Sequence, residues 1–155
     1  MKLSEIMVEE AIIPELKAHT RDEAIAELVE SLAAAGSIPK KSVPDVIKAV
    51  LARESQATTG IGKGVALPHA KLAGIKKPVG TIGRSSAGID FSSLDAKLVY
   101  SVILLLSSPE NPDEHLQAME AIFKHVQRDM FRKFLRQSET REAIVDLIHE
   151  ADDMG

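Results

Sequence analysis

The alternation of apolar and polar residues along the chain predicts helices and short strands in turn. Apolar residues recur at helical spacing in several stretches, and short continuous apolar runs lie between them. We expect strands at residues 65–67, 79–83 and 98–106. The last run is apolar on both faces, which is typical of a central strand covered by helices on each side. The pattern therefore predicts a mixed α/β domain.

Capping signals predict where the first helices begin and end. Thr20 and Glu23 have the spacing of a capping box, in which each residue bonds the backbone of the other. The helix that they open is expected to end near Gly36, because glycine adopts the left-handed conformation that terminates a helix. A second helix is expected to begin at Ser42.

Further signals place the remaining elements. Asn111 precedes a proline, and this pair predicts the start of a long amphipathic helix. A break is expected near Asp129, and Ser138 is expected to cap the final helix. Near the N-terminus, residues 11–17 are predicted to form a short edge strand, because Pro14 lacks the N–H that a central strand needs.

The length of the chain and the absence of repeats indicate a single domain. The chain has 155 residues, no internal repeat and no low-complexity stretch. A domain of this size buries about 70% of its unfolded surface, which is enough for a core without disulfides. We therefore expect residues 1–155 to form one three-layer α/β/α domain with a mixed central β-sheet, and the segment 71–78 to be its most mobile loop.

Composition excludes several classes of function. Cysteine is absent, which rules out disulfides, thiolate metal sites and a cysteine nucleophile. The net charge of −4, the pI near 5.7 and the 3% of aromatic residues argue against nucleic acid as a partner. The longest apolar run, residues 102–106, is too short to cross a membrane, and the N-terminus lacks a signal-peptide core. We expect a cytoplasmic protein without membrane insertion.

The most informative segment is rich in glycine and ends in a histidine. Gly60, Gly62 and Gly64 lead into a short apolar strand, and Pro68 stiffens the backbone before His69. Glycine permits positive φ and close backbone approach, which suits a loop whose N–H groups face an anion. The segment predicts an anion-binding loop beside His69.

The sequence lacks the motifs of several other well-known binding and catalytic sites. The glycine spacing fits neither a Walker A loop nor a dinucleotide fingerprint, and the chain contains no Gly-x-Ser-x-Gly elbow and no His-Glu-x-x-His motif. His19, His125 and His149 lie on separate predicted elements, and each is interpreted as a helix-flanking or surface residue. No metal or organic cofactor is expected.

The segment from Arg53-Glu54 through Thr58-Thr59-Gly60-Ile61-Gly62-Lys63-Gly64-Val65-Ala66-Leu67-Pro68-His69 resembles the active-site signature of the type-2 enzyme IIA family. This is the fructose, mannitol and nitrogen-regulatory branch of the phosphoenolpyruvate-dependent phosphotransferase system (PTS). The similarity continues in the family's order through Gly88-Ile89-Asp90-Phe91, Asp95, Leu104-Leu105-Leu106 and His115-Leu116. It covers most of the chain and implies the enzyme IIA mannitol/fructose-type fold.

The resemblance implies specific roles for residues of the site. His69 would accept a phosphoryl group on the ring nitrogen remote from the backbone, with His115 beside it and Arg53 bound to the phosphoryl oxygens. Arginine suits that role because its planar fork makes paired hydrogen bonds. The expected position of His115, in the first helical turn, disfavours its charged form. Thr59 and Gly60, Gly62 and Gly64 are expected to add phosphate-binding donors.

The resemblance also implies partners. The donor would be the histidine-containing phosphocarrier protein, and the acceptor an enzyme IIB domain. Two functions remain open: a nitrogen-regulatory module that binds other proteins according to its phosphorylation, and a sugar-specific component that relays phosphate for fructose or mannitol uptake. The chain carries no fused phosphocarrier, IIB or membrane segment, which favours the regulatory hypothesis. A fold that has lost activity and serves only as an interaction domain is the third alternative.

Overall fold

The computed structural model describes residues 1–154. The helices are α1 (Leu3–Ile6), α2 (Arg21–Ala34), α3 (Val43–Gln56), α4 (Pro112–Val126), α5 (Asp129–Gln137) and α6 (Arg141–Asp153), with short 3-10 turns η1 (Glu9–Ala11) and η2 (Lys40–Ser42). The strands are β1 (Gly60–Gly62), β2 (Val65–Ala66), β3 (His69–Lys71), β4 (Val79–Ile89) and β5 (Val99–Ser107).

Strand β5 is the centre of a mixed sheet. It pairs with β4 in antiparallel register on one side and with both β2 and β3 in parallel register on the other. Strand β1 extends the sheet by antiparallel pairing with β2. The N-terminal segment lies along β4, where Met7 and Ile13 form isolated bridges to Gly80 and Gly83.

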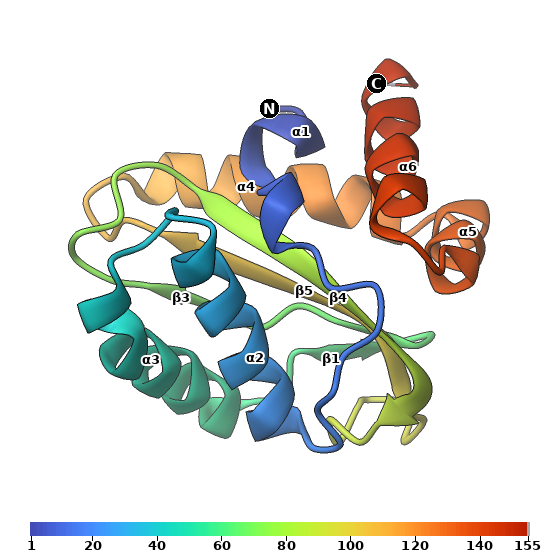
Figure 1. The fold of residues 1–155 in the computed structure, drawn as a ribbon, viewed down its shortest axis with the longest axis horizontal. Coiled ribbons are helices and arrows are strands. Elements are labelled where there is room, and N and C mark those ends of the chain that lie inside the picture. Colours follow the sequence, from blue (N-terminus) through green and yellow to red (C-terminus); the bar gives the residue numbers. More distant parts are fainter. Residues whose placement is uncertain (155) are drawn as a thin grey trace.

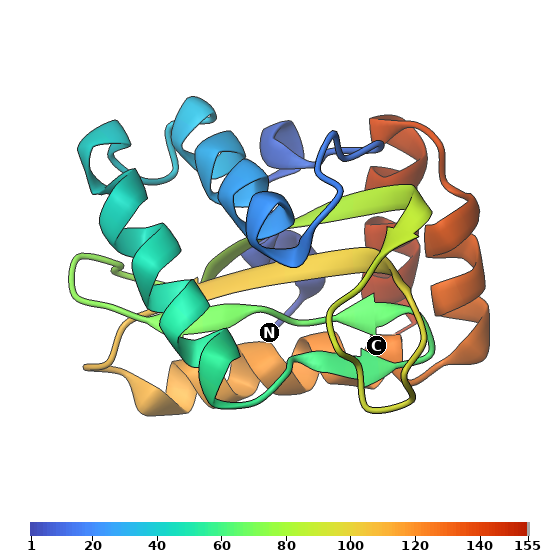
Figure 2. The ribbon, with the colours of Figure 1, turned by 90° about the horizontal axis from the view of Figure 1, so that it is seen from below.

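Helices cover both faces of this sheet (Figures 1 and 2). Helices α2 and α3 lie on one face, and α4 and α6 lie on the opposite face with α1. The alternation of side chains along β5 supplies both cores, because Leu104 and Leu106 face the α2 and α3 side whereas Ile103 and Leu105 face the other. The predicted three-layer α/β/α architecture is confirmed.

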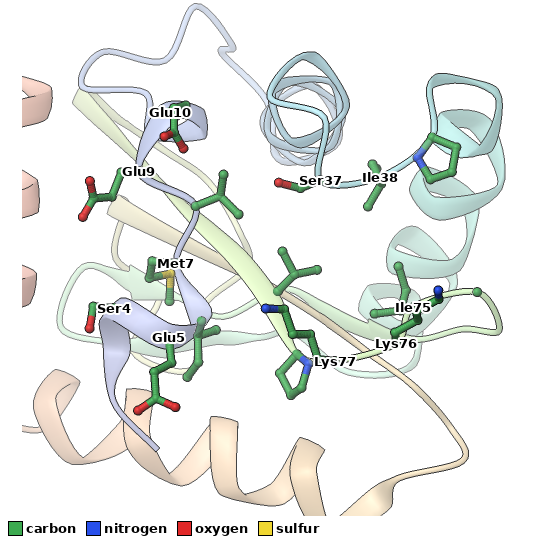
Figure 3. Close-up of a pocket in the computed structure, with 16 residues that line it drawn as sticks. Ser4, Glu5, Met7, Glu9, Glu10, Ser37, Ile38, Ile75, Lys76 and Lys77 are labelled. Atoms are coloured by element: carbon green, nitrogen blue, oxygen red, sulfur yellow. The ribbon is translucent and has the colours of Figure 1, made fainter.

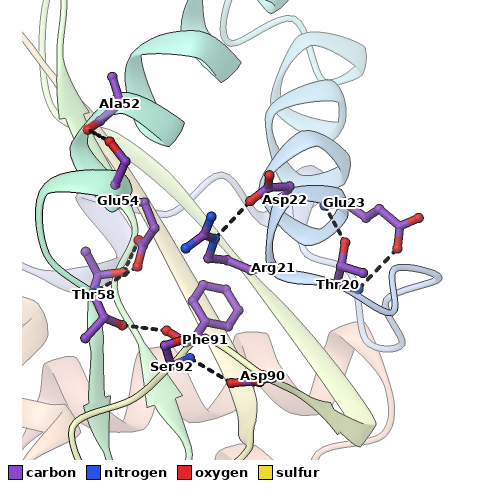
Figure 4. Close-up of polar contacts among 12 residues, drawn as sticks. Thr20, Arg21, Asp22, Glu23, Ala52, Glu54, Thr58, Asp90, Phe91 and Ser92 are labelled. Atoms are coloured by element: carbon purple, nitrogen blue, oxygen red, sulfur yellow. Dashed lines mark hydrogen bonds and ion pairs between the residues drawn. The ribbon is translucent and has the colours of Figure 1, made fainter.

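The helix ends follow most of the predicted caps. The Thr20 hydroxyl accepts a bond from the Glu23 N–H at 3.2 Å, and the Glu23 carboxylate reaches back to the Thr20 N–H, so the capping box is present (Figure 4). Helix α4 begins at Pro112 as predicted, although the Asn111 side chain makes no capping bond. Gly36 follows α2 with a φ of 79°, in the left-handed region that only glycine adopts readily.

The predicted cap of the last helix is wrong by two residues. Thr140 caps α6 by accepting from the Ala143 N–H, whereas the Ser138 hydroxyl donates to the Phe134 carbonyl at the end of α5. Ser138 is therefore already used by the preceding helix. Either residue can cap by its chemistry, and the length of α5 decides between them.

The strand predictions need three corrections. Residues 11–17 lie at the edge of the sheet but form no continuous strand, since Pro14 interrupts the pairing. Strand β4 continues to Ile89 instead of ending at Gly83, with an irregularity after Arg84. Strands β1 and β3 were not predicted, because three-residue strands carry too little apolar pattern.

The two ends of the chain meet on one side of the sheet (Figure 1). The Asp152 carboxylate near the end of α6 accepts the N–H groups of Leu3 at 2.7 Å and Ser4 at 3.1 Å, which satisfies the start of α1. Among residues 1–154, no helix combines the length and the apolar character that crossing a membrane requires.

Candidate active site

Strand β3 carries His69 at its first residue. Ala66 faces Val102 and His69 faces Leu105, so the parallel register with β5 continues across Pro68, where the pairing is briefly interrupted. The Leu105 N–H donates to the Pro68 carbonyl at 3.0 Å. The neighbouring central strand therefore fixes the position of His69.

Strand β5 also brings a second histidine to the site. Strand β5 ends at Ser107, and the turn after it starts helix α4, whose first turn holds His115. The rings of His69 and His115 lie with centroids 5.6 Å apart and planes tilted by 46°. His115 is 9% exposed, and its Nδ1 bonds the buried Ser107 hydroxyl. The two histidines that the sequence singled out are thus neighbours in space.

A backbone contact selects the protonation state of His69. Its Nδ1 lies 2.7 Å from the Leu67 carbonyl oxygen. A carbonyl only accepts hydrogen bonds, so Nδ1 must carry the proton and donate it. In the neutral ring, Nε2 then holds a free lone pair. The backbone contact thereby leaves the available lone pair on the ring nitrogen remote from the main chain.

Two cationic side chains share a shallow hollow of about 370 Å³ with the histidines. Arg53, in the last turn of α3, donates through Nη1 to the Ala57 carbonyl at 2.9 Å. Lys71 follows His69 by two residues on β3, so both side chains lie on the same face of the strand. Lys71 was not predicted as a site residue, although this spacing could have indicated it.

Both histidines favour the neutral form. Burial lowers the pKa of His69 below its ordinary value of 6.5; the nearby Arg53 and Lys71 lower it as well, while the bond to Leu67 and the charge of Glu54 act in the opposite direction. Burial, with smaller contributions from His69 and Lys71, lowers the pKa of His115 to about 4. A cationic, partly dry hollow with two neutral imidazoles suits an anion.

The lowered pKa of His115 predicts a dependence of stability on pH. The unfolded chain takes up a proton near pH 6.5, whereas the folded chain does so only near pH 4, so the folded state loses stability as the pH falls through this window. We expect this residue to reduce the free energy of unfolding by about 2 kcal/mol between pH 7 and pH 5. Urea unfolding at both values measures the loss, and His115→Gln, which cannot titrate, should show a smaller one. An equal loss in both proteins would contradict the assignment.

Thr59 does not join the histidines. Its hydroxyl donates to one oxygen of the buried Glu54 carboxylate at 2.5 Å, and its N–H donates to the other at 2.7 Å. Figure 4 shows Glu54 directed toward this loop from α3. A hydroxyl has one proton to donate, so Thr59 cannot also donate to a phosphoryl group in this arrangement. Thr59 fixes the start of the loop instead.

The glycines also serve another purpose than predicted. Gly62 and Gly64, with φ values of 96° and 81°, flank Lys63 in the turn between β1 and β2, and the Lys63 N–H donates to the Asp95 carboxylate at 2.9 Å. Gly60 allows close approach of Ser93. Val65, just after the turn, pairs with Ser101 of β5, whereas His69 pairs with Leu105. These two partners are four residues, or about 13 Å, apart along β5. The structure therefore places this turn away from the histidines.

The remaining histidines lie outside the site. His19 and His149 are at the surface, and His149 pairs with Glu9 at 3.1 Å. His125 is buried against Phe131, which corrects its interpretation as a surface residue; helix α4 is covered on that side by α5. A larger cleft, near 610 Å³, has Glu5, Glu9 and Glu10 opposite Lys76 and Lys77 (Figure 3) and shares no residue with the hollow at His69.

Comparison with known proteins identifies the class. Residues 5–151 match the family described as "Phosphoenolpyruvate-dependent sugar phosphotransferase system, EIIA 2". The chain belongs to this family, and it is accordingly a component of a phosphotransferase relay.

Its relatives include proteins of both branches. The chain is 34% identical over 98% of its length to the fructose-specific EIIABC component of Bacillus subtilis, of which it spans 24%. It is 33% identical to a nitrogen regulatory protein of Bradyrhizobium diazoefficiens, with 96% and 95% of the two chains covered. The crystal structure of the nitrogen regulatory protein IIA-Ntr from Neisseria meningitidis superimposes with a TM-score of 0.84 at 25% identity, covering 94% and 98%.

Proposed function

We propose that His69 carries a phosphoryl group on Nε2, accepting it from a phosphorylated donor and passing it on. The observation that carries the proposal is the donation of Nδ1–H to the Leu67 carbonyl, which leaves the Nε2 lone pair free next to the hollow. No separate base is needed, because a neutral imidazole attacks phosphorus directly.

The transfer is a displacement at phosphorus. By resemblance to the family, the donor is the phosphohistidine of the histidine-containing phosphocarrier protein. The donor P–N bond breaks as the P–Nε2 bond of His69 forms, and the leaving ring nitrogen keeps the electron pair. Negative charge spreads over the three equatorial oxygens, so fixed donors and cations around His69 lower the barrier. The P–N bond formed on His69 stays reactive enough for the next transfer.

Three side chains are placed to stabilise that charge. His115 lies against His69 and donates through Nε2–H when its Nδ1 accepts from Ser107. Arg53 and Lys71 supply two positive charges from opposite elements of the hollow. Arg53 can use the N–H groups that its bond to Ala57 leaves free.

Ser107 is a positioning residue in this proposal. We expect Ser107→Ala to slow phosphoryl acceptance about tenfold, because His115 loses the bond that holds its proton on Nε2. Nitrogen NMR of the imidazole reports the tautomer directly, and Ser107→Thr, which keeps a hydroxyl, should restore both tautomer and rate. A rate loss without any change of tautomer would contradict this role.

The relatives support two kinds of onward partner. The name of the Bacillus relative combines the A, B and C components in one chain, which supports an enzyme IIB domain as acceptor. The similarity to nitrogen regulatory proteins supports the alternative, in which phosphorylation of His69 controls binding to target proteins. Relatives of both kinds match at similar identity, so the comparisons favour neither.

A reconstituted relay tests the proposal. The protein is incubated with phosphoenolpyruvate, enzyme I and the phosphocarrier, and intact mass is measured before and after mild acid. We expect one acid-labile phosphoryl group, mapped by fragmentation to His69. Absence of a label with active donors from both the sugar and the nitrogen-related branches would refute the proposal and favour a silent interaction domain. Addition of an enzyme IIB domain then shows whether the label moves on.

A further inference from the structure

A second cleft, of about 780 Å³, lies between α5 and the turn that joins β1 to β2. Its walls hold five cationic side chains and two carboxylates, in a chain whose net charge is −4. The cations are Lys63, Arg84, Arg132, Lys133 and Arg136. The local charge is thus opposite to that of the whole protein, and a cleft lined by one sign of charge concentrates counter-ions.

Arg84 forms a rigid part of this cleft. It is 7% exposed, its Nε donates to the Arg136 carbonyl at 2.7 Å, and its Nη1 donates to the Pro14 carbonyl at 2.9 Å. The Glu15 carboxylate lies 3.5 Å from Nη1. Nη2 has no hydrogen-bond partner among residues 1–154, and Arg84 lines the cleft, so the guanidinium retains donors for a further hydrogen bond. Arginine held in this way loses little conformational freedom on binding an anion.

Three cations at the cleft differ from Arg84, which pairs with Glu15, in having no carboxylate partner among the described residues. Within the described part of the chain, Lys63, Lys133 and Arg136 form no ion pair, whereas Arg132 pairs with Asp129. The guanidinium of Arg136 lies 3.6 Å above the centroid of the Tyr100 ring, which holds it in place. The other carboxylate of the cleft, Glu139, forms no ion pair among residues 1–154.

The backbone conformation of Lys63 supports a role for its charged side chain in ligand binding. Lys63 has a φ of 58°, between two glycines that are also left-handed. Asparagine or glycine adopts this conformation more readily than lysine. A lysine at the tip of this turn is therefore not explained by local conformational preference, and the residue lines the cleft.

We propose that this cleft binds a small anion with two or more phosphate groups. A single carboxylate brings one negative charge, whereas an anion with two phosphate groups brings several at neutral pH, which matches the three cations that lack a carboxylate partner. Arg84, which is paired with Glu15, adds hydrogen-bond donors. The site is distinct from the hollow at His69. The cleft and the hollow share no lining residue. Along β5, Arg84 pairs with Ser101 and His69 pairs with Leu105, four residues further on.

Calorimetric titration of the unphosphorylated protein with inorganic pyrophosphate tests the proposal. We expect saturable binding that weakens about tenfold in the double variant Lys133→Gln/Arg136→Gln, because two charged hydrogen-bonding groups are lost. Lys63→Asn should weaken binding several-fold while the melting temperature stays constant or rises, since asparagine suits the turn better. This variant separates loss of the ligand from loss of the fold.

The matched control carries the same change of charge elsewhere. Lys40→Gln/Lys41→Gln removes two exposed lysines from η2 and should bind pyrophosphate as the parent does. No saturable binding, or an equal loss in this control, would overturn the proposal. Equal or tighter binding of citrate would overturn the phosphate class, and preferential binding of a polyglutamate peptide would make the cleft a docking surface for acidic proteins instead. No phosphoryl donor is present, so the result is independent of the relay.

Discussion

Alanine in place of His69 is expected to abolish phosphoryl labelling of the protein. The substitution removes the Nε2 lone pair that the Leu67 carbonyl prepares, and we expect the neighbouring His115 not to take over. The pKa of His115 is lowered to about 4, and its lower basicity accompanies a weaker nucleophile. In the reconstituted relay, intact mass should show no added phosphoryl group at any time at which the parent is fully labelled.

The matched control is another histidine outside the site. His149 is exposed and pairs only with Glu9, so His149→Ala should be labelled to the same extent and at the same rate as the parent. Both variants should keep the parent's circular dichroism spectrum. Acid-labile labelling of His69→Ala would show that another residue is the phosphoryl carrier, and the mechanism proposed here would then be wrong.

Replacement of His115 by alanine is expected to leave a folded protein that accepts phosphate far more slowly. The variant loses one donor aimed at the developing charge, and loss of such a donor costs about 10²-fold to 10³-fold in rate. His115 is buried, but it lies in the first turn of α4, whose start is set by Pro112, so we expect the helix to form without it. Rapid-quench measurement of a single turnover gives the rate, and the label should still map to His69.

Glutamine at position 115 is the informative comparison. Its side-chain amide keeps an N–H donor but cannot titrate, so His115→Gln should recover part of the rate lost in His115→Ala. Rates equal to the parent in both variants would show that His115 contributes nothing to transfer. Equal, severe losses in both would indicate that the imidazole itself, and not its N–H, is required.

The parts of the fold that could be predicted are those with local causes. The capping box at Thr20 and the proline after Asn111 determine helix starts through contacts within four residues. The apolar run of β5 predicts a strand buried on both faces, which the two cores confirm. Ser138 shows the limit of this approach, because two nearby residues had equal capping chemistry and the preceding helix decided between them.

The site could be predicted only in part. Arg53, His69 and His115 were named from the resemblance, and the structure brings all three to one hollow. Thr59 and the glycines were expected at the same place because the resemblance and the glycine-rich sequence indicated a phosphate-binding loop. The short strands β1 and β2 carry the turn to the other end of the sheet, and Glu54 takes the hydroxyl of Thr59.

The family, the α/β class, most helix boundaries and the candidate histidines follow from the sequence, since these depend on local pattern and on a motif. Which groups meet depends on the tertiary structure. The parallel pairing of β3 with β5 sets His69 beside the strand that ends at Ser107 and leads into His115, and the Leu67 carbonyl leaves the free lone pair of His69 on Nε2. The cationic cleft at Arg84 likewise gathers residues from three distant segments. Such contacts join positions far apart in sequence, and their register follows from packing of the whole sheet.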